Sequence, residues 1–218
     1  MDIFENLRKG AKFILPLQDD VILYISICLL SYLIGDIPFA FIFSKMVKRI
    51  DIRYEGEGNV GARNVLHIIG KPYGILVALL DFSKGFVIAL LCLSFKLPFY
   101  ITVIAGFSVV LGHDFPVFLK FKGGKGVATA LGFLLGLYPI PTFATLFLML
   151  IIFSIKRYYL FAMAIGIASL PVLWMPLFKH SIKEIIFTVS FLSFLGIKRI
   201  IDIPHMRRVR ETSGWDKR

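Results

Sequence analysis

The chain has 218 residues, of which 57% are hydrophobic and 18% are charged, and its mean hydropathy is +0.80. Soluble domains contain fewer apolar and more charged residues, so this composition excludes an ordinary soluble protein and predicts an all-α helical bundle in a membrane. The net charge of +11 indicates loops that face an anionic membrane surface and phosphate-bearing ligands rather than nucleic acid.

The chain begins with a segment that is basic and only partly apolar. Residues 1–19 include Arg8, Lys9 and Lys12, and the apolar run that follows them has no small-residue cleavage pattern. We therefore expect an amphipathic surface segment here rather than a removable signal peptide. After it we expect a single transmembrane domain over residues 20–203 and a basic cytoplasmic tail over residues 204–218.

Seven apolar runs follow, and they predict the spanning helices. They lie near residues 21–43, 73–95, 98–119, 127–137, 139–155, 158–178 and 182–201. A spanning helix needs about 20 residues, so the fourth and fifth runs together are too long for one span. Gly136 and Pro139-Ile140-Pro141 predict a break between these two runs. Two separate helices give seven spans in total, whereas one merged helix gives six.

The distribution of lysine and arginine favours seven spans. With seven, 18 of the 25 basic residues lie on one side of the membrane and six on the other, with Lys84 inside a span. Because cytoplasmic loops are enriched in lysine and arginine, this arrangement places the N-terminus outside and the C-terminus in the cytoplasm. Six spans would separate Lys156-Arg157 from the basic C-terminus, which fits the rule less well.

The first polar motif interrupts the first apolar run. Gly35-Asp36-Ile37-Pro38 places the carboxylate of Asp36 in the middle of that run. An ionisable side chain inside a span is costly, so Asp36 is a candidate substrate-binding residue. The alternative is a helix kink at Pro38, with Asp36 facing a water-filled cavity.

A loop rich in glycine and asparagine follows at residues 55–64. Its glycines allow the backbone to approach a ligand closely, and its amide and guanidinium groups can donate hydrogen bonds to phosphate or hydroxyl oxygens. Glu55 and Glu57 oppose an anion, so the loop is not purely a phosphate cradle, and an ordinary flexible loop is the alternative. We expect these residues of the loop to bind substrate: Gly56, Gly58, Asn59, Gly61, Arg63 and Asn64.

Two motifs in the next apolar runs carry the candidate catalytic residues. Asp81 and Lys84 are three residues apart, so they share a helix face and can pair. Lys84 is a candidate anion binder because a charge inside a span is costly, and a structural ion pair is the alternative. His113 is a candidate general base near the cytoplasmic face. The alternative for His113 is a hydrogen-bonding residue at a helix end.

A glycine-lysine loop over residues 121–129 separates the third and fourth runs. Its glycines bring backbone N–H groups close to an anion, and the helix that follows directs the positive end of its dipole to the same place. Anchoring at the cytoplasmic surface would explain the lysines but not the glycines. We expect phosphate binding by Lys122, Gly123, Gly124, Lys125 and Gly126.

Taken in order, these motifs resemble those of the bacterial acyl-phosphate:glycerol-3-phosphate acyltransferases, the PlsY family. The resemblance runs from about Gly35 to the C-terminus and is strongest at residues 58–62, 64, 79–81, 84–85, 111–113, 115–116 and 121–130. It implies a multi-pass protein of the bacterial cell (inner) membrane that needs no metal or cofactor. It also implies transfer of a fatty acyl group from acyl phosphate to the 1-hydroxyl of glycerol 3-phosphate, which gives lysophosphatidic acid for phospholipid biosynthesis.

The chain departs from the pattern of this family at several polar positions. Serine, serine, threonine, arginine and serine are replaced by Asp36, Glu57, Arg63, His67 and Tyr159, and the expected C-terminal histidine and asparagine fall at Asp202 and His205. These departures favour a second hypothesis, a divergent paralogue that binds another phosphorylated or lipid ligand. The intramembrane charges by themselves leave open a small transporter, although no inverted repeat is evident. The sequence does not indicate an oligomeric state.

Overall fold

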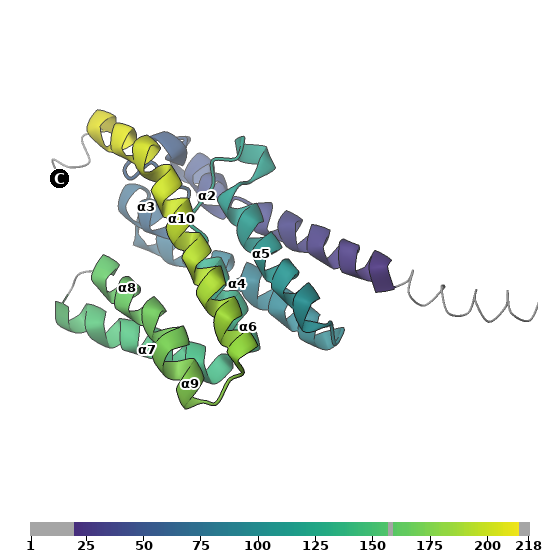
Figure 1. Cartoon of the computed structure of the whole chain (residues 1–218). Helices are drawn as coiled ribbons and strands as arrows, with labels where there is room; N and C mark the ends of the chain where they lie inside the picture. Colours follow the sequence, from purple (N-terminus) through teal and green to yellow (C-terminus); the bar gives the residue numbers. More distant parts are fainter. Residues whose placement is uncertain (1–19, 157–158, 214–218) are drawn as a thin grey trace, which may run out of the picture.

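The computed structural model describes residues 20–156 and 159–213, and the regular elements in these ranges are helices (Figure 1). The segment expected to be amphipathic, residues 1–19, lies outside the described residues. The first described helix covers residues 20–36. After it come α2 (Phe39–Lys48), η1 (Ile52–Tyr54), α3 (Ala62–Ile68), α4 (Lys71–Ser94), α5 (Phe99–Asp114), η2 (Val117–Leu119), α6 (Val127–Leu137), α7 (Pro139–Lys156), α8 (Tyr159–Ser169), η3 (Leu170–Trp174), α9 (Met175–Leu177) and α10 (Ile182–Ser213).

Among the described residues, three helical segments are long and apolar enough to cross a membrane: Asp20–Lys48, Lys71–Ser94 and Phe99–Leu119. Shorter apolar helices lie at Val127–Leu137, Pro139–Ile155 and Phe161–Leu177. Large side chains such as Ile25, Leu79 and Phe143 are exposed on the outer faces of these helices, where a soluble protein would be polar. The expected all-helical membrane fold is thereby confirmed.

Prolines mark two of the helix breaks. The first helix ends at Asp36 and α2 begins at Phe39, so the break falls at Ile37 and Pro38. The break between α6 and α7 falls at Tyr138, directly before Pro139. Proline lacks an N–H donor and crowds the preceding turn, but it is well tolerated as the first residue of a helix. The structure therefore shows a helix break at Pro38, the alternative considered for this motif, and it confirms the separation of residues 127–137 from 139–155.

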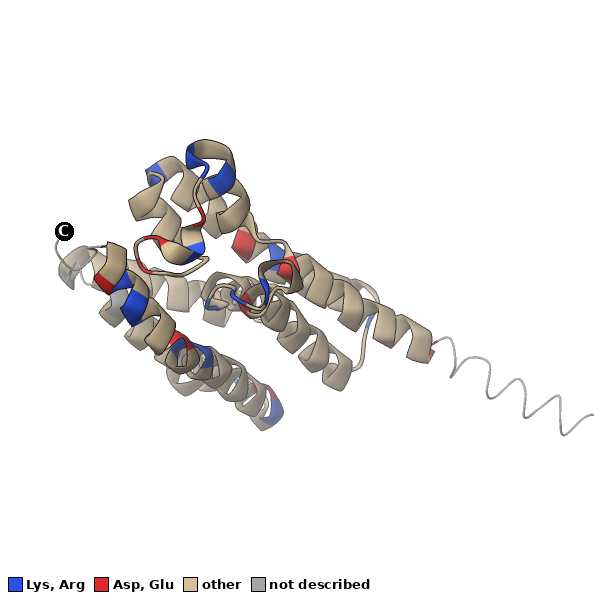
Figure 2. Cartoon of the chain, turned by 90° about the horizontal axis from the view of Figure 1, so that it is seen from above, with Lys and Arg blue, Asp and Glu red and all other residues tan. Residues whose placement is uncertain are grey.

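The last helix is longer than its apolar run. α10 contains 32 residues and continues through Pro204 as far as Ser213, into the part that we expected to be a basic tail. This end of α10 lies over the loop at residues 55–61: the hydroxyl of Ser213 donates to the carbonyl of Gly56 at 3.3 Å. Figure 2 shows basic residues gathered on α10 and on the loops, whereas long stretches of the other helices carry none. The basic end of α10 thus belongs to the same region as the candidate site.

Glycines allow two central helices to approach closely. A Cβ atom at Gly85 of α4 would lie 1.8 Å from the carbonyl oxygen of Thr129, and one at Gly132 of α6 would lie 1.9 Å from the carbonyl oxygen of Phe82. Small residues at helix interfaces permit such backbone contact within membranes. Next to this contact, Phe133 packs edge-on against Phe187 and at a tilt against Phe191, and these two rings of α10 stack on each other. This packing fixes the start of α6, and with it the glycine-lysine loop.

We expect Gly132→Ala to lower the free energy of unfolding by about 1–3 kcal/mol, because the added methyl group forces two packed backbones apart. Thermal unfolding of the purified protein in detergent measures the change. Gly196→Ala is the matched control, since a Cβ atom at Gly196 on α10 meets nothing within 4 Å. That control should leave stability unchanged or raise it by about 0.5–1 kcal/mol, the usual gain when alanine replaces glycine in a helix. Equal destabilisation by both substitutions would contradict the packing described here.

Candidate active site

The loop at residues 55–61 is rigidly held, and it directs Glu57 inward. Gly56 and Gly58 have φ values of 58° and 66°, which side-chain-bearing residues rarely adopt. Between them, the N–H of Glu57 donates to the side-chain oxygen of Asn64 at 2.9 Å. The side-chain nitrogen of Asn64 lies 3.2, 2.9 and 2.9 Å from the carbonyl oxygens of Ile52, Glu55 and Asn59. Asn64, which we expected to contact substrate, is fully buried and ties the loop together.

The glycine-lysine loop is folded back onto the end of α5. The N–H groups of Gly123 and Gly124 donate to the carbonyls of Asp114 and His113 at 3.2 and 3.0 Å. These two amides, which we expected to cradle phosphate, are therefore occupied by the fold. A Cβ atom at Gly124 would lie 2.0 Å from Nε2 of His113, so glycine is required for this contact. The loop then delivers Lys125, while Lys122 points away, with its Nζ 5.6 Å from the ring centre of Tyr54.

Lys84 is the anchor of a buried polar cluster. Its Nζ donates to Oδ1 of Asp81 at 2.8 Å, to the carbonyl of Gly35 at 3.3 Å and also to the carbonyl of Ile37. Because the first helix ends before Pro38, the carbonyl of Gly35 needs another donor, which Lys84 supplies, while the carbonyl of Ile37 accepts from both Lys84 and the N–H of Phe39. The predicted pairing of Asp81 with Lys84 is confirmed. Lys84 is only 4% exposed, and its contacts support the structural alternative rather than a role in binding substrate.

His113 lies against the same cluster. Its Nδ1 is 3.6 Å from Oδ1 of Asp81, and its Nε2 faces Gly124. Asp36, a further predicted site residue, is 1% exposed and borders a separate small cavity of about 10 Å³ with His113 and Gly123. Asp36 therefore does not line the main cavity, which is described next.

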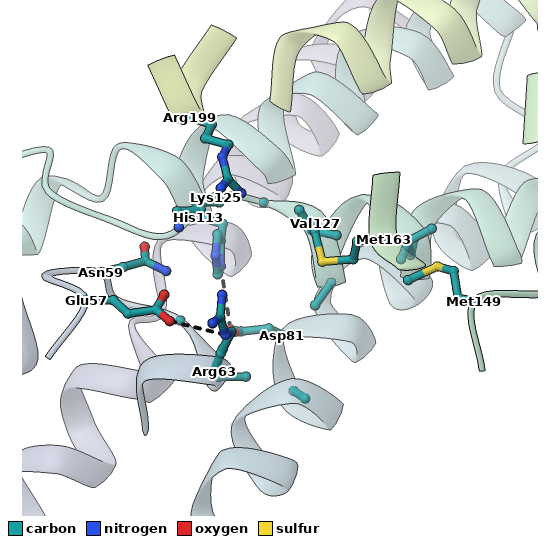
Figure 3. A pocket seen from close by; sticks show the side chains of 16 residues that line it. Glu57, Asn59, Arg63, Asp81, His113, Lys125, Val127, Met149, Met163 and Arg199 are labelled. Carbon is teal, nitrogen blue, oxygen red and sulfur yellow. Dashed lines mark ion pairs between the residues drawn. The ribbon is translucent and has the colours of Figure 1, made fainter. Parts of the chain in front are cut away.

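The cavity in which the charged residues of the two loops meet, which we call the main cavity, measures about 170 Å³. It lies where α3, α4, α5, α6, α7, α8 and α10 converge on these loops (Figure 3). One end is charged, with Glu57, Arg63, Lys125 and Arg199 in its wall. The opposite end is apolar. Figure 3 shows Met149 of α7 and Met163 of α8 beyond Val127, on the side away from Glu57. This cavity suits an anionic head group at its charged end, and an apolar chain attached to that group would extend past the methionines at the other end.

Positive charge is concentrated at the polar end. Burial, together with the neighbouring Arg199, Arg210 and Arg63, lowers the pKa of Lys125 to about 8, while Glu57 acts in the opposite direction. Arg63 also pairs with Glu57, with 3.2 Å between its Nε and Oε1 of the carboxylate. Within the described part of the chain, no group of three or more His, Cys, Asp or Glu residues could hold a metal ion. The cations at the charged end of the cavity can bind an anion, and one carboxylate, that of Glu57, lies beside them.

Comparison with known proteins identifies the chain. The family model described as glycerol-3-phosphate acyltransferase matches residues 25–209. The chain belongs to this family. A glycerol-3-phosphate acyltransferase from Desulforamulus reducens is 37% identical over 81% of this chain and 88% of its own length. Another from Aquifex aeolicus is 46% identical over 59% of this chain and 67% of its own length.

Two solved structures of the family have the same fold. The crystal structure of PlsY, an integral membrane glycerol 3-phosphate acyltransferase, in its glycerol 3-phosphate form has a TM-score of 0.75 and is 34% identical. Its lysophosphatidic acid form has a TM-score of 0.73 and is 32% identical. Each comparison covers 88% of this chain and 93% of the solved chain.

In this family member, the structure brings only part of the predicted site together. The predicted residues that line the main cavity are Asn59, Gly61, Arg63, His113, Lys125 and Gly126. Those that do not line it are Asp36, Gly56, Gly58, Asn64, Lys84, Lys122, Gly123 and Gly124.

Glu57, Arg199 and the methionines at the apolar end also line the cavity, and none of them was predicted to do so from the sequence. Lys198-Arg199 interrupts the last apolar run. Because charges inside a span are costly, this interruption could have indicated that Arg199 belongs to the site. Nothing in the local sequence distinguishes Met149 or Met163 from other apolar residues.

Proposed function

We propose that this chain transfers a fatty acyl group from acyl phosphate to the sn-1 hydroxyl of glycerol 3-phosphate, which gives lysophosphatidic acid for phospholipid synthesis in a bacterial cell membrane. The observation that carries this proposal is the cavity itself. Its charged end suits the phosphates of both substrates, and its apolar end suits an acyl chain. Membership of the glycerol-3-phosphate acyltransferase family supports the same reaction.

The residues at the charged end take the phosphate-binding roles. Arg63 and Arg199 are suited to forked hydrogen bonds with phosphate, and Lys125 adds a compact positive charge. Acyl phosphate is already an activated donor, so neutralising charge and positioning the two substrates supply much of the catalysis. Val127, Met149 and Met163 form the apolar side toward which the acyl chain extends.

We also infer seven membrane-embedded helical segments, with the N-terminus outside and the C-terminus in the cytoplasm. The segments are Asp20–Lys48, α4, α5, α6, α7, α8 with α9, and α10. The excess of lysine and arginine on the loop side supports this orientation. The 11 residues of α6 make a helix about 16 Å long, roughly half of the hydrocarbon thickness, so we place α6 as a partial crossing below the glycine-lysine loop.

The direct test supplies purified protein in detergent with acyl phosphate and radiolabelled glycerol 3-phosphate. We expect labelled lysophosphatidic acid to form at a rate proportional to the amount of protein. A relative from the same family, assayed in parallel, establishes that the conditions permit the reaction. Absence of product under conditions in which that relative is active would refute the proposal.

Binding of glycerol 3-phosphate should weaken above about pH 8. Below the pKa of Lys125, which is lowered to about 8, the ammonium group attracts phosphate. As the pH rises through this value the charge is lost, so KM for glycerol 3-phosphate should rise up to about 10-fold per pH unit. Initial rates between pH 7 and 9.5 measure the effect. Lys125→Arg stays protonated throughout this range, so its KM should remain flat, and an identical rise in that variant would assign the dependence to another group.

A further inference from the structure

Glu57 is a buried carboxylate that the binding of phosphates does not explain. Its side chain is 1% exposed and lies in the cavity wall opposite cations. Oε1 of Glu57 accepts no hydrogen bond from the described residues, although it forms an ion pair with Nε of Arg63 at 3.2 Å. A buried ionised oxygen without a donor is costly, so a bound ligand that supplies a donor would relieve this cost.

The loop prevents Glu57 from turning away from the cavity. Gly56 and Gly58, both in the left-handed region, set the direction of the residue between them. The hydrogen bond from its N–H to Asn64 fixes the backbone at that point. The carboxylate is therefore preorganised in the cavity wall in the absence of substrate.

The chemistry of the Glu57 carboxylate determines which group of a ligand it can bind. An ionised carboxylate only accepts hydrogen bonds, so it repels a phosphate group and attracts an O–H group. Of the groups that the proposed reaction brings into the cavity, the hydroxyls of glycerol 3-phosphate are the ones that offer a proton. We therefore expect the attacking hydroxyl to lie at Glu57, with the phosphates on Arg63, Lys125 and Arg199.

The cavity wall contains three further acid–base groups, Asp81, His113 and the cation Lys125, and the first two lie against each other. Oδ1 of Asp81 accepts a hydrogen bond from Lys84 at 2.8 Å. Nδ1 of His113 lies 3.6 Å from the same oxygen, and its Nε2 packs against Gly124. Oε1 of Glu57 differs from Oδ1 of Asp81 because it accepts no hydrogen bond from the described residues.

We propose that Glu57 is the general base of the acyl transfer, an inference that rests on the proposed function above. The hydroxyl oxygen of the acceptor forms a bond to the acyl carbon while its proton moves to the Glu57 carboxylate. The bond between the acyl carbon and the phosphate oxygen breaks, and phosphate leaves with the bonding electron pair. Glu57 then returns its proton to the departing phosphate or to water. Arg63 pairs with this carboxylate, with its Nε 3.2 Å from Oε1.

Glu57→Gln tests the proposal, because glutamine keeps the shape and can still accept a hydrogen bond from the hydroxyl but is not a base. We expect kcat to fall by about 100- to 10,000-fold, the usual contribution of general base catalysis, with little change in KM for glycerol 3-phosphate. If glutamine leaves kcat unchanged or raises it, the proposal is wrong. A lower KM together with an unchanged kcat would show instead that Glu57 merely competes with phosphate.

Rescue of a Glu57 variant by added anions distinguishes two roles for this carboxylate: a base that accepts a proton, or a negative charge that only balances the nearby cations. Glu57→Ala leaves room for a small anion, and formate should restore part of kcat, whereas nitrate, which has the same planar shape but is not basic, should not. Equal rescue by both anions would overturn the assignment. If the alanine variant does not fold, Glu57→Asp takes its place and must be more active than Glu57→Gln. Wild-type protein is assayed alongside, so that an inactive wild type counts against the proposed function and not against Glu57 alone.

Discussion

Replacing Lys125 by alanine is expected to raise KM for glycerol 3-phosphate by about 10- to 100-fold. A hydrogen bond to a charged group contributes about 1.5–3 kcal/mol, and this range corresponds to that change in affinity. Burial and the crowding of arginines around Lys125 show how strongly this point in the cavity favours an anion. Steady-state rates at several concentrations of glycerol 3-phosphate measure the effect.

Lys122→Ala is the matched control. It removes the same charge from the same loop, but the side chain is exposed and its Nζ lies over the ring of Tyr54 rather than in the cavity. Its KM should stay within about twofold of the wild type, since a single exposed charge contributes little. Equal losses in the two variants would mean that the loop attracts the substrate by its overall charge and that Lys125 has no specific contact.

Lys84→Met is expected to lower the free energy of unfolding by about 3–5 kcal/mol, the usual effect of removing one partner from a buried ion pair. The substitution leaves Asp81 unpaired and removes the donor from the carbonyls of Gly35 and Ile37. Thermal unfolding in detergent measures the loss. The double variant Lys84→Met with Asp81→Leu should recover part of it, because no buried charge of the pair then remains.

The exposed pair Arg207–Glu211 supplies the comparison. Its side chains are 81% and 63% exposed, so Arg207→Met should change stability by about 0–1 kcal/mol. A Lys84→Met protein that unfolds like the wild type yet has lost its activity would contradict the structural role. Such a result would instead support the catalytic role that was first considered for Lys84 from the sequence.

The helices and their breaks could be predicted from the sequence because their causes are local. Apolar runs predict the helices, and Pro38 and Pro139 mark where helices stop. The pairing of Asp81 with Lys84 also followed from spacing, since residues three apart share a helix face. These features depend on neighbours in the chain, and the structure agrees with them.

The parts of the site that could not be predicted depend on tertiary contacts. The amides of Gly123 and Gly124 were expected to be available for phosphate, but the fold turns them toward the carbonyls at the end of α5. Arg199 and Met163 join the cavity only because helices distant in the sequence converge there. A motif indicates which groups a loop contains, whereas the surrounding helices decide which of those groups remain available to a ligand.

Glu57 illustrates the same distinction. In the sequence it stands against an anion-binding role for its loop, and it departs from the serine of the resembling family. In the structure it lies beside Arg63, a second departure, so the two replacements form an ion pair in the cavity wall. Two of the departures therefore lie in contact within one site.

The most direct test of this account is the stoichiometry of the reaction catalysed by the purified wild-type protein. Acyl phosphate and glycerol 3-phosphate are supplied, and both inorganic phosphate and lysophosphatidic acid are quantified over time. The account predicts that the two products appear together in equal amounts and only when both substrates are present. Release of phosphate without lysophosphatidic acid, or no release where a related acyltransferase is active, would contradict it.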